Sequence, residues 1–124
     1  MKKSKLYLLI ALLGLLFSAC VYDFEAVEGV PSVDGDVSFS ATINPIFQNK
    51  CATCHKVGGV KPVPDLTTNN AYNSINSDKY INTDSPESSL IYTEASPDGT
   101  HGGKYSRAEA ALVLTWIQQG AQNN

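Results

Sequence analysis

The stretch Cys51-Ala52-Thr53-Cys54-His55 decides how this chain folds. Its two thiols are separated by two residues, and a histidine follows the second thiol directly. At this spacing each thiol can add across one vinyl group of a single porphyrin, and the histidine is placed to coordinate the iron. The stretch therefore predicts one covalently attached haem, haem c, with His55 as a ligand of its iron.

Two other uses of these residues remain open. Zinc takes four ligands, which Cys51, Cys54 and two histidines could supply, but the adjacent Cys54 and His55 cannot easily both reach one tetrahedral ion. A redox-active pair of cysteines normally lies at a strand-to-helix turn, and no alternating strand pattern surrounds this pair. We therefore favour haem over both alternatives.

The iron's second axial position constrains the rest of the chain. That position usually falls to methionine or histidine. The only methionine is Met1, and the only histidine besides His55 is His101. We therefore expect His101 as the second ligand of the iron. A five-coordinate iron, or Lys104 as the ligand, are the alternatives.

The N-terminus has the pattern of an export signal. Lys2, Lys3 and Lys5 precede an apolar run, residues 6–17, that is too short to span a bilayer. The segment Leu16-Phe17-Ser18-Ala19-Cys20 that follows resembles the lipobox of bacterial lipoproteins. We predict a signal peptide at residues 1–19, a lipid on Cys20, and a lipid-anchored membrane protein of the bacterial cell envelope facing the periplasm or the cell surface. An ordinary signal peptide cut after Ala19 is the alternative.

The cysteine count agrees with both assignments. The chain has three cysteines. Lipid would take Cys20, and haem would take Cys51 and Cys54. No thiol is then left free, and no disulfide is needed, in a compartment where a free exposed thiol is a liability.

The charge balance describes the expected mature protein. Nine basic and twelve acidic residues make up the chain, and three of the basic ones lie in the predicted signal, so six minus twelve gives a mature net charge of −6. This balance argues against nucleic-acid binding and favours a docking partner with a basic face. Residues 20–36 are acidic and contain glycine and proline, so we predict a flexible tether there, followed by one domain at residues 37–124.

Helical patterns dominate the predicted domain. Ile43, Ile46 and Phe47 predict a helix over about 40–49, capped by Ser40 or Thr42 and with Pro45 in its first turn. The clearest pattern comes last. It begins at a capping box, Ser106 and Glu109, ends at Gly120, and has one apolar face: Leu112, Val113, Trp116 and Ile117.

Two weaker patterns lie between these helices. A short helix is predicted from Thr67 or Thr68, carrying Tyr72 and Ile75. Another opens at Asp84-Ser85-Pro86-Glu87 and presents Leu90, Ile91 and Tyr92. Strand patterns are sparse, so the sequence predicts a mostly α domain whose loops lie over the porphyrin.

With these residues in view, the domain resembles the class I cytochromes c over nearly its whole length. Ile46-Phe47-Gln48-Asn49-Lys50 running into the haem motif is similar to the family's first helix. Lys61-Pro62-Val63-Pro64-Asp65-Leu66 is similar to its Lys-x-Gly-Pro-x-Leu loop, and Val113-Leu114-Thr115-Trp116-Ile117 to its terminal helix. The resemblance implies a small, mostly α domain wrapped around one covalent haem.

The resemblance also implies roles for single residues. The carbonyl of Pro64 would accept the Nδ1 proton of His55 and fix its tautomer. Leu66 would lie against the ring, and Phe47 would pack against the final helix. Four tyrosines can pack on the porphyrin or donate to a propionate, and the sequence does not separate these roles: Tyr72, Tyr80, Tyr92 and Tyr105.

The sequence looks in particular like the short cytochrome c domains of bacterial lipoproteins. Gly103-Lys104-Tyr105-Ser106 and Trp116-Ile117-Gln118-Gln119-Gly120 follow the pattern of their last turn and helix. Two departures stand out. Thr100-His101-Gly102-Gly103 replaces the methionine loop, and Ile43 stands where the family usually has a small residue.

The resemblance implies a lipid-anchored monohaem carrier that passes single electrons between redox protein partners, with no small-molecule substrate. A haem-based sensor or ligand-binding module, with an open or displaceable sixth position, is the alternative. An oxidase or peroxidase would need distal acid–base groups, and none can be named from the sequence. Carbon monoxide binding by the reduced protein separates a capped iron from an open one.

Overall fold

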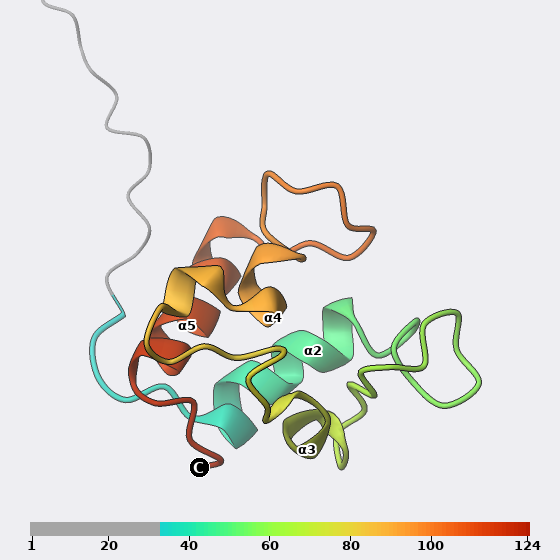
Figure 1. Ribbon diagram of the computed structural model, residues 1–124, viewed down its shortest axis with the longest axis horizontal. Helices are drawn as coiled ribbons and strands as arrows, with labels where there is room; N and C mark the ends of the chain where they lie inside the picture. The colour runs from blue at the N-terminus through green and yellow to red at the C-terminus, as the bar shows by residue number, and fades with distance from the viewer. Residues whose placement is uncertain (1–32) are drawn as a thin grey trace, which may run out of the picture.

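The structure, a computed structural model, describes residues 33–124 as a helical domain. Its elements are η2 (Phe39–Ile43), α2 (Asn44–Lys50), α3 (Ala71–Ile75), η3 (Pro86–Ser88), α4 (Leu90–Thr93) and α5 (Arg107–Gln118) (Figure 1). These residues contain no strand. The predicted signal peptide, Cys20 and most of the predicted tether lie outside the described residues.

The first predicted helix divides into two elements. A π-helical turn, η2, runs directly into α2, and Pro45 lies in the first turn of α2. The N-cap is Ser38, whose hydroxyl accepts from the Ala41 amide at 3.2 Å, and neither Ser40 nor Thr42 is the cap. A proline ring collides with the carbonyl four residues before it, so the backbone widens to i→i−5 hydrogen bonds just ahead of Pro45.

The last helix has the predicted caps. The Ser106 hydroxyl accepts from the Glu109 amide, and the Glu109 carboxylate accepts from the Ser106 amide, so the capping box is confirmed. Gly120 ends the helix with φ of +92°, a conformation that glycine adopts at little cost. The buried face of α5 consists of Ala110, Ala111, Val113, Trp116 and Ile117. Leu112, predicted on this face, is only partly buried and packs against the core.

The two middle helices are shorter than the patterns suggest. The chain between 86 and 93 is broken at Ser89, whose backbone is extended (φ −60°, ψ 128°). The buried Ser89 hydroxyl accepts from the Asn82 amide at 2.9 Å, and this contact across seven residues stabilises the break. Earlier in the chain, α3 begins at Ala71 because Thr67 closes a separate turn to Asn70 and Ala71.

An aromatic cluster joins the two ends of the domain. The Phe39 ring lies 6.2 Å from Phe47, 5.1 Å from Tyr72 and 5.4 Å from Trp116, between ring centres. Phe47 and Trp116 share this core, and Ile43 is fully buried on η2, which packs against α5. Phe39 is central to the cluster, although the sequence patterns did not identify it.

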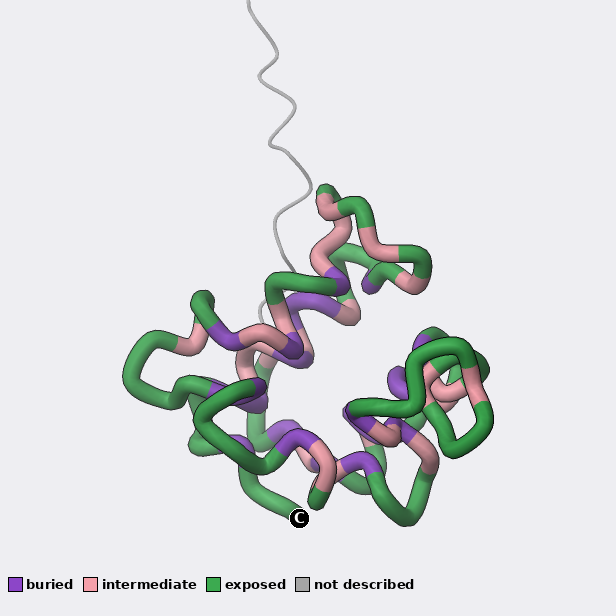
Figure 2. The backbone as a smooth tube through the Cα atoms, turned by 45° about the vertical axis from the view of Figure 1, so that its right-hand side comes forward, coloured by how far each residue is buried: buried purple, intermediate pink, exposed green. Residues whose placement is uncertain are grey.

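Both ends of the described chain are held on the same side of the domain. Gln119 accepts from the Val37 amide at 2.8 Å and donates to the Gly35 carbonyl at 3.0 Å. The Asn124 side chain accepts from the Phe39 amide at 2.8 Å. In Figure 2, exposed residues lie mainly along the outer loops, whereas buried stretches line the inside of the chain path. No helix within residues 33–124 is long and apolar enough to cross a membrane.

Candidate functional site: a haem pocket

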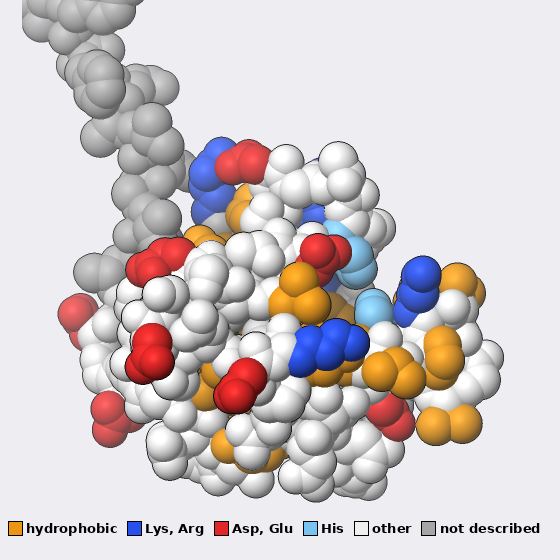
Figure 3. All heavy atoms as spheres, in the orientation of Figure 1, with side chains coloured by type: hydrophobic (Ala, Val, Ile, Leu, Met, Phe, Trp, Pro, Cys, Tyr) orange, Lys and Arg blue, Asp and Glu red, His pale blue; other side chains and the backbone are white. Residues whose placement is uncertain are grey.

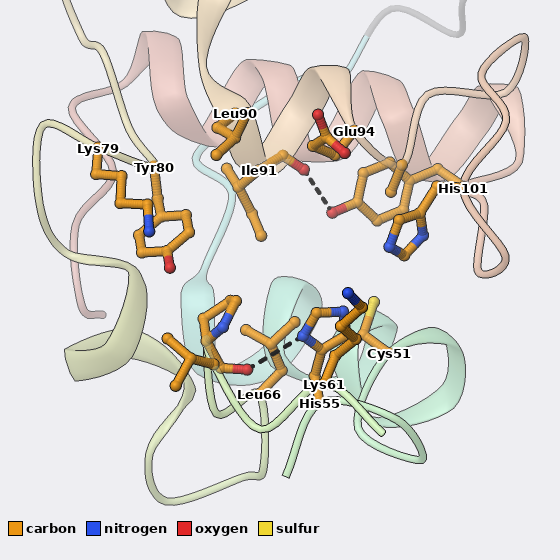
Figure 4. Close-up of a pocket in the computed structure, with 14 residues that line it drawn as sticks. Cys51, His55, Lys61, Leu66, Lys79, Tyr80, Leu90, Ile91, Glu94 and His101 are labelled. Atoms are coloured by element: carbon orange, nitrogen blue, oxygen red, sulfur yellow. Dashed lines mark hydrogen bonds between the residues drawn. The ribbon is translucent and has the colours of Figure 1, made fainter. Parts of the chain in front are cut away.

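A cavity of about 440 Å³ opens between the segment that follows α2 and the segment around α4 (Figure 4). Its volume is within the range of ligand pockets in proteins. Its lining residues come from both segments: Cys51, His55, Lys61, Val63, Pro64, Leu66, Lys79, Tyr80, Leu90, Ile91, Glu94, Ala95, His101 and Tyr105. The cavity therefore brings together Cys51, His55, Pro64, Leu66 and His101, all predicted as site residues.

The haem motif forms a tight turn at the end of α2. Cys51 is the C-cap of that helix, and its carbonyl accepts from the amides of Cys54 and His55 at 3.1 and 2.9 Å. Cys51 is buried and lines the cavity, whereas Cys54 is exposed and does not. Burial, reinforced by the nearby Glu109 carboxylate, raises the pKa of the Cys51 thiol to about 11.

His55 is held by the loop that follows it. Its Nδ1 lies 3.2 Å from the Pro64 carbonyl, and its own carbonyl accepts from the Leu66 amide at 2.9 Å. An Nδ1 proton donated to a carbonyl leaves Nε2 unprotonated on the neutral ring. Burial lowers the pKa of His55, and the nearby His101 and Lys61 lower it further. The hydrogen bond to the Pro64 carbonyl raises the pKa but does not outweigh these effects. The neutral imidazole, which is the metal-binding form, is therefore favoured.

Asp65 shapes the same loop from outside the cavity. Its carboxylate accepts from the Thr67 amide and hydroxyl at 3.0 and 2.7 Å and from Asn70 at 2.9 Å. The bonds from Thr67 hold the pKa of Asp65 below its ordinary value. On the inner side, Leu66 is 2% exposed and presents an apolar surface to the cavity.

His101 lies on the opposite wall of the cavity. Its Nδ1 is 2.9 Å from the Gly103 carbonyl and 3.2 Å from the Gly103 amide, so the ring is held by its own loop. Gly103 in turn lies against the end of α2, because a Cβ at this position would be 2.5 Å from the Lys50 carbonyl. The absence of a side chain at Gly103 thus lets the His101 loop approach the helix that precedes Cys51.

The two histidine rings face each other across the cavity. Their centres are 5.9 Å apart, and their planes lie 24° from parallel. Figure 4 shows His55 and Leu66 on one wall, and Leu90, Ile91 and His101 on the other. A thiol, two imidazoles and apolar walls in one cavity fit a flat iron porphyrin.

The structure separates the four tyrosines that the sequence left together. Tyr80 and Tyr105 line the cavity, whereas Tyr72 belongs to the aromatic cluster and donates to the Ala121 carbonyl at 3.1 Å. Tyr92 is partly buried against the core. The Tyr105 hydroxyl donates to the Ile91 carbonyl at 2.9 Å, and burial raises its pKa well above the ordinary value.

The cavity is lined by charged side chains of both signs, and exposed apolar side chains lie beside it. Lys61, Lys79 and Glu94 are among the lining residues, and the Lys79 ammonium lies 4.9 Å from the centre of the Tyr80 ring. The loop after His55 holds three large hydrophobic residues that are 70–84% exposed: Val57, Val60 and Val63. Figure 3 shows the histidines at the surface beside a projection that bears hydrophobic and basic side chains. Lys79, Val57 and Val60 belong to none of the motifs in the sequence.

These features define a class of protein, helical domains that enclose a haem attached through a Cys-x-x-Cys-His motif. The family model for cytochrome c matches residues 40–121, and the chain therefore belongs to the cytochrome c family. Comparison with curated proteins and with solved structures gave no match. The membership confirms the mostly α, class I-like fold and the single covalent haem c, and it makes the protein an electron-transfer protein.

Several functional contacts were not found from the sequence. Lys79 and Glu94 line the cavity from segments without any motif. Gln48, within the first helix, donates to the Leu66 carbonyl at 2.9 Å and so reaches the loop beneath His55. Hydrogen bonds of this kind join residues far apart in the chain, and a single sequence carries no pattern for them. A four-ligand metal site of the zinc type has no counterpart among residues 33–124.

Proposed function

We propose that this protein is a lipid-anchored monohaem carrier of single electrons whose iron is ligated by His55 and His101. Cys51 and Cys54 would hold the porphyrin through thioether bonds. The haem supplies a one-electron couple when it is bound. The protein's own residues hold both imidazoles, exclude water with apolar walls and present one edge of the site to a partner.

The spacing of the two imidazoles carries this proposal. Metal–imidazole bonds are about 2 Å long and a ring centre lies about 1 Å beyond the bonded nitrogen, so two rings on opposite sides of one metal ion have centres about 6 Å apart. The centres of the His55 and His101 rings are 5.9 Å apart. The observed separation therefore supports ligation of one iron by both rings.

The hydrogen bonds of both rings support the same ligand set. His55 lies with Nδ1 3.2 Å from the Pro64 carbonyl, and His101 lies with Nδ1 2.9 Å from the Gly103 carbonyl. Metal-binding histidines usually donate their second ring N–H to a carbonyl or carboxylate, which fixes the ring and strengthens its donation. The Gly103 amide also lies 3.2 Å from Nδ1 of His101, so this ring can hold its proton on either nitrogen. In the tautomer that donates Nδ1 to the Gly103 carbonyl, Nε2 of His101 is available to the iron, as Nε2 of His55 is.

The charges around the cavity favour a partner with an acidic contact surface, whereas the net charge favours one with a basic surface. Within residues 33–124, Lys50 pairs with Glu109 and Arg107 with Asp98, at 3.5 and 3.4 Å. The four remaining lysines have no acidic partner there, and each one lines the cavity or is next in sequence to a residue that does: Lys56, Lys61, Lys79 and Lys104. Three acidic residues meet the same condition, Asp65, Asp78 and Glu94, so the lysines leave a small positive excess around the cavity.

We therefore propose that electrons leave and enter through this lysine-rimmed mouth, toward redox proteins whose contact surface is acidic. The exposed valines at 57, 60 and 63 supply the apolar centre of the contact. Small transient contacts of this type give fast association and release. This proposal differs from the basic-faced partner that the net charge alone favours, because local charge at the contact governs docking.

The lipid anchor rests on residues outside the described structure. The lipobox-like segment before Cys20 and the acidic stretch at 20–36 support a domain held near the membrane surface of the cell envelope. A tether of this composition lets an anchored carrier reach partners around its point of attachment.

Exposure of the reduced holoprotein to carbon monoxide tests the function. An iron held on both faces by His55 and His101 has no open position, so the absorption spectrum should not change over minutes. Immediate formation of a carbon monoxide complex at stoichiometric concentrations would favour the sensor or ligand-binding alternative and overturn the assignment as a carrier.

A further inference from the structure

The loop beneath His55 is fastened to α2 by two side-chain amides. The Gln48 amide donates to the Leu66 carbonyl at 2.9 Å and to the Asn44 side-chain oxygen at 2.8 Å. The Asn44 amide then donates to the Thr68 carbonyl at 3.0 Å. One turn of α2 therefore holds two carbonyls of the loop through a continuous chain of hydrogen bonds, which we call the amide ladder.

The amide ladder is sheltered and leaves little freedom. Asn44 is 8% exposed, although its side chain is polar, and the bonds of Gln48 are part-buried. Two amide hydrogens are available on Gln48, and both are used. Asn44 and Gln48 are four residues apart and thus share one face of α2. Loss of either side chain leaves a carbonyl without its donor, which costs more than the bond itself contributes.

The ladder connects directly to the ring of His55. Leu66, whose carbonyl accepts from Gln48, donates its amide to the His55 carbonyl at 2.9 Å. Two residues earlier, the Pro64 carbonyl meets Nδ1 of His55 at 3.2 Å. The position of the Pro64 carbonyl therefore depends on where the ladder holds Leu66. Neither Asn44 nor Gln48 lines the cavity, so any influence they have on the site passes through this loop.

We propose that Asn44 and Gln48 are positioning residues that set the reduction potential of the iron by holding the Pro64 carbonyl against Nδ1 of His55. This inference rests on the proposed ligation by His55. A hydrogen bond from Nδ1 makes the imidazole a stronger donor, and a stronger donor stabilises ferric iron. Without the amide ladder the loop is held less firmly, and the hydrogen bond between the Pro64 carbonyl and Nδ1 of His55 becomes weaker. Loss of the ladder should therefore raise the reduction potential of the iron.

Gln48→Met tests the ladder, because methionine has a similar length and no amide hydrogen. At a fixed ambient potential, the ratio of ferrous to ferric protein should rise, because the weaker hydrogen bond makes His55 a weaker donor to ferric iron. The Nδ1 proton of His55, observed by NMR, should exchange faster with solvent. Asn44→Ala should shift the potential in the same direction, and the double variant should shift it no further, because both substitutions break one chain of bonds.

Two controls separate positioning from general destabilisation. Asn49→Ala changes the exposed neighbour of Gln48 and should leave the potential unchanged. Ser106→Ala removes a helix cap on α5 and should lower stability without moving the potential. If Gln48→Met fails to take up haem, Gln48→Asn, which is one methylene too short to reach both partners, takes its place.

The proposal is overturned if the Gln48 variant matches wild type in both potential and Nδ1 exchange, or if it shifts the potential only as much as Ser106→Ala does. The absorption spectrum of the same variants reports separately on ligation. If the wild-type iron is low-spin and the variants have the wild-type potential, the positioning role of the amide ladder is rejected and the proposed ligation stands. A wild-type spectrum without two nitrogen ligands would reject the proposed function.

Discussion

Gly103 lies directly against the backbone of Lys50, the last residue of α2. A Cβ at Gly103 would be 2.5 Å from the Lys50 carbonyl, closer than real contacts allow. This contact joins the loop of His101 to the helix that leads into Cys51. The two walls of the haem cavity are therefore fixed relative to each other by a glycine that no other residue can replace without movement of the loop.

Gly103→Ala should move His101 away from the iron. We expect a high-spin fraction in the ferric absorption spectrum and increased binding of carbon monoxide by the reduced protein. Gly102→Ala is the matched control, because a Cβ there meets nothing within 4 Å. Equal spectra for the two variants would show that the contact with Lys50 does not position His101.

The lysine-rimmed mouth should govern electron exchange with small ions. The expected mature chain has a formal net charge of −6, so its overall charge repels an anion such as ferricyanide. If exchange occurs at the mouth, ferricyanide instead meets local positive charge. The rate of oxidation should then fall as ionic strength rises from about 0.01 to 0.5 M, because the screening length shortens from about 30 Å at 0.01 M to less than about 10 Å above 0.1 M.

Charge-removing variants locate the exchange site. Lys61→Gln with Lys79→Gln should flatten the salt dependence of oxidation by ferricyanide. Arg107→Gln removes one charge at a position paired with Asp98 and should leave the salt dependence as in wild type. A ferricyanide rate that rises with salt in the wild-type protein would contradict exchange through this mouth.

Cys20→Ser tests the anchor. The mature domain should move from the membrane fraction to the soluble fraction, since one hydroxyl cannot replace the apolar surface of a lipid. The haem content per protein should stay the same, because Cys51 and Cys54 are untouched. Recovery of the wild-type protein in the soluble fraction, with an unmodified Cys20, would reject the lipobox assignment.

The cap of α5 should contribute measurably to stability. Ser106→Ala should lower the free energy of unfolding by about 1 kcal/mol, the usual cost of losing an N-cap. Urea denaturation of the holoprotein, followed by circular dichroism, gives this value. No change would mean that the capping box adds nothing to the packing of α5 on the core.

Glu109 should make part of this stability depend on pH. Burial works to raise its pKa, but the bonds from Ser106 and the charge of Lys50 outweigh burial and hold the pKa below its ordinary value. A carboxyl with a lowered folded-state pKa stabilises the protein above its unfolded pKa, about 4.3, and this stability is lost as pH falls through the folded value.

Glu109→Gln isolates that charge, because glutamine can still complete a capping box. The variant should be less stable than wild type by about 0.5 kcal/mol at pH 7, and the difference should shrink as the pH falls below the unfolded pKa of about 4.3. A difference that stays constant over this range, measured by urea denaturation, would exclude a contribution from the ionised carboxylate.

Local patterns made part of the fold and site predictable. The haem motif is contiguous, the capping box of Ser106 and Glu109 spans four residues, and both work through contacts between near neighbours. His101 could be predicted as the second axial ligand because it is the only histidine besides His55, and the only methionine is Met1, in the predicted signal peptide.

The features that could not be predicted from the sequence depend on contacts between separate elements. The break at Ser89 follows from its bond to Asn82, and the central place of Phe39 follows from rings on three other elements. The amide ladder joins α2 to a loop on the far side of the haem motif. In each case the deciding partner is set by the tertiary fold, which propensity and periodicity do not contain.

Ferric absorption and electron-spin-resonance spectra of the wild-type holoprotein, compared with those of His101→Ala, test the central claim most directly. With both imidazoles bound, the wild-type iron should be low-spin and should lack the long-wavelength band that a sulfur ligand gives. His101→Ala should turn high-spin or take an exogenous ligand. If His101→Ala leaves the spectrum and spin state unchanged, His101 is a surface residue and the proposed ligation by two histidines is wrong.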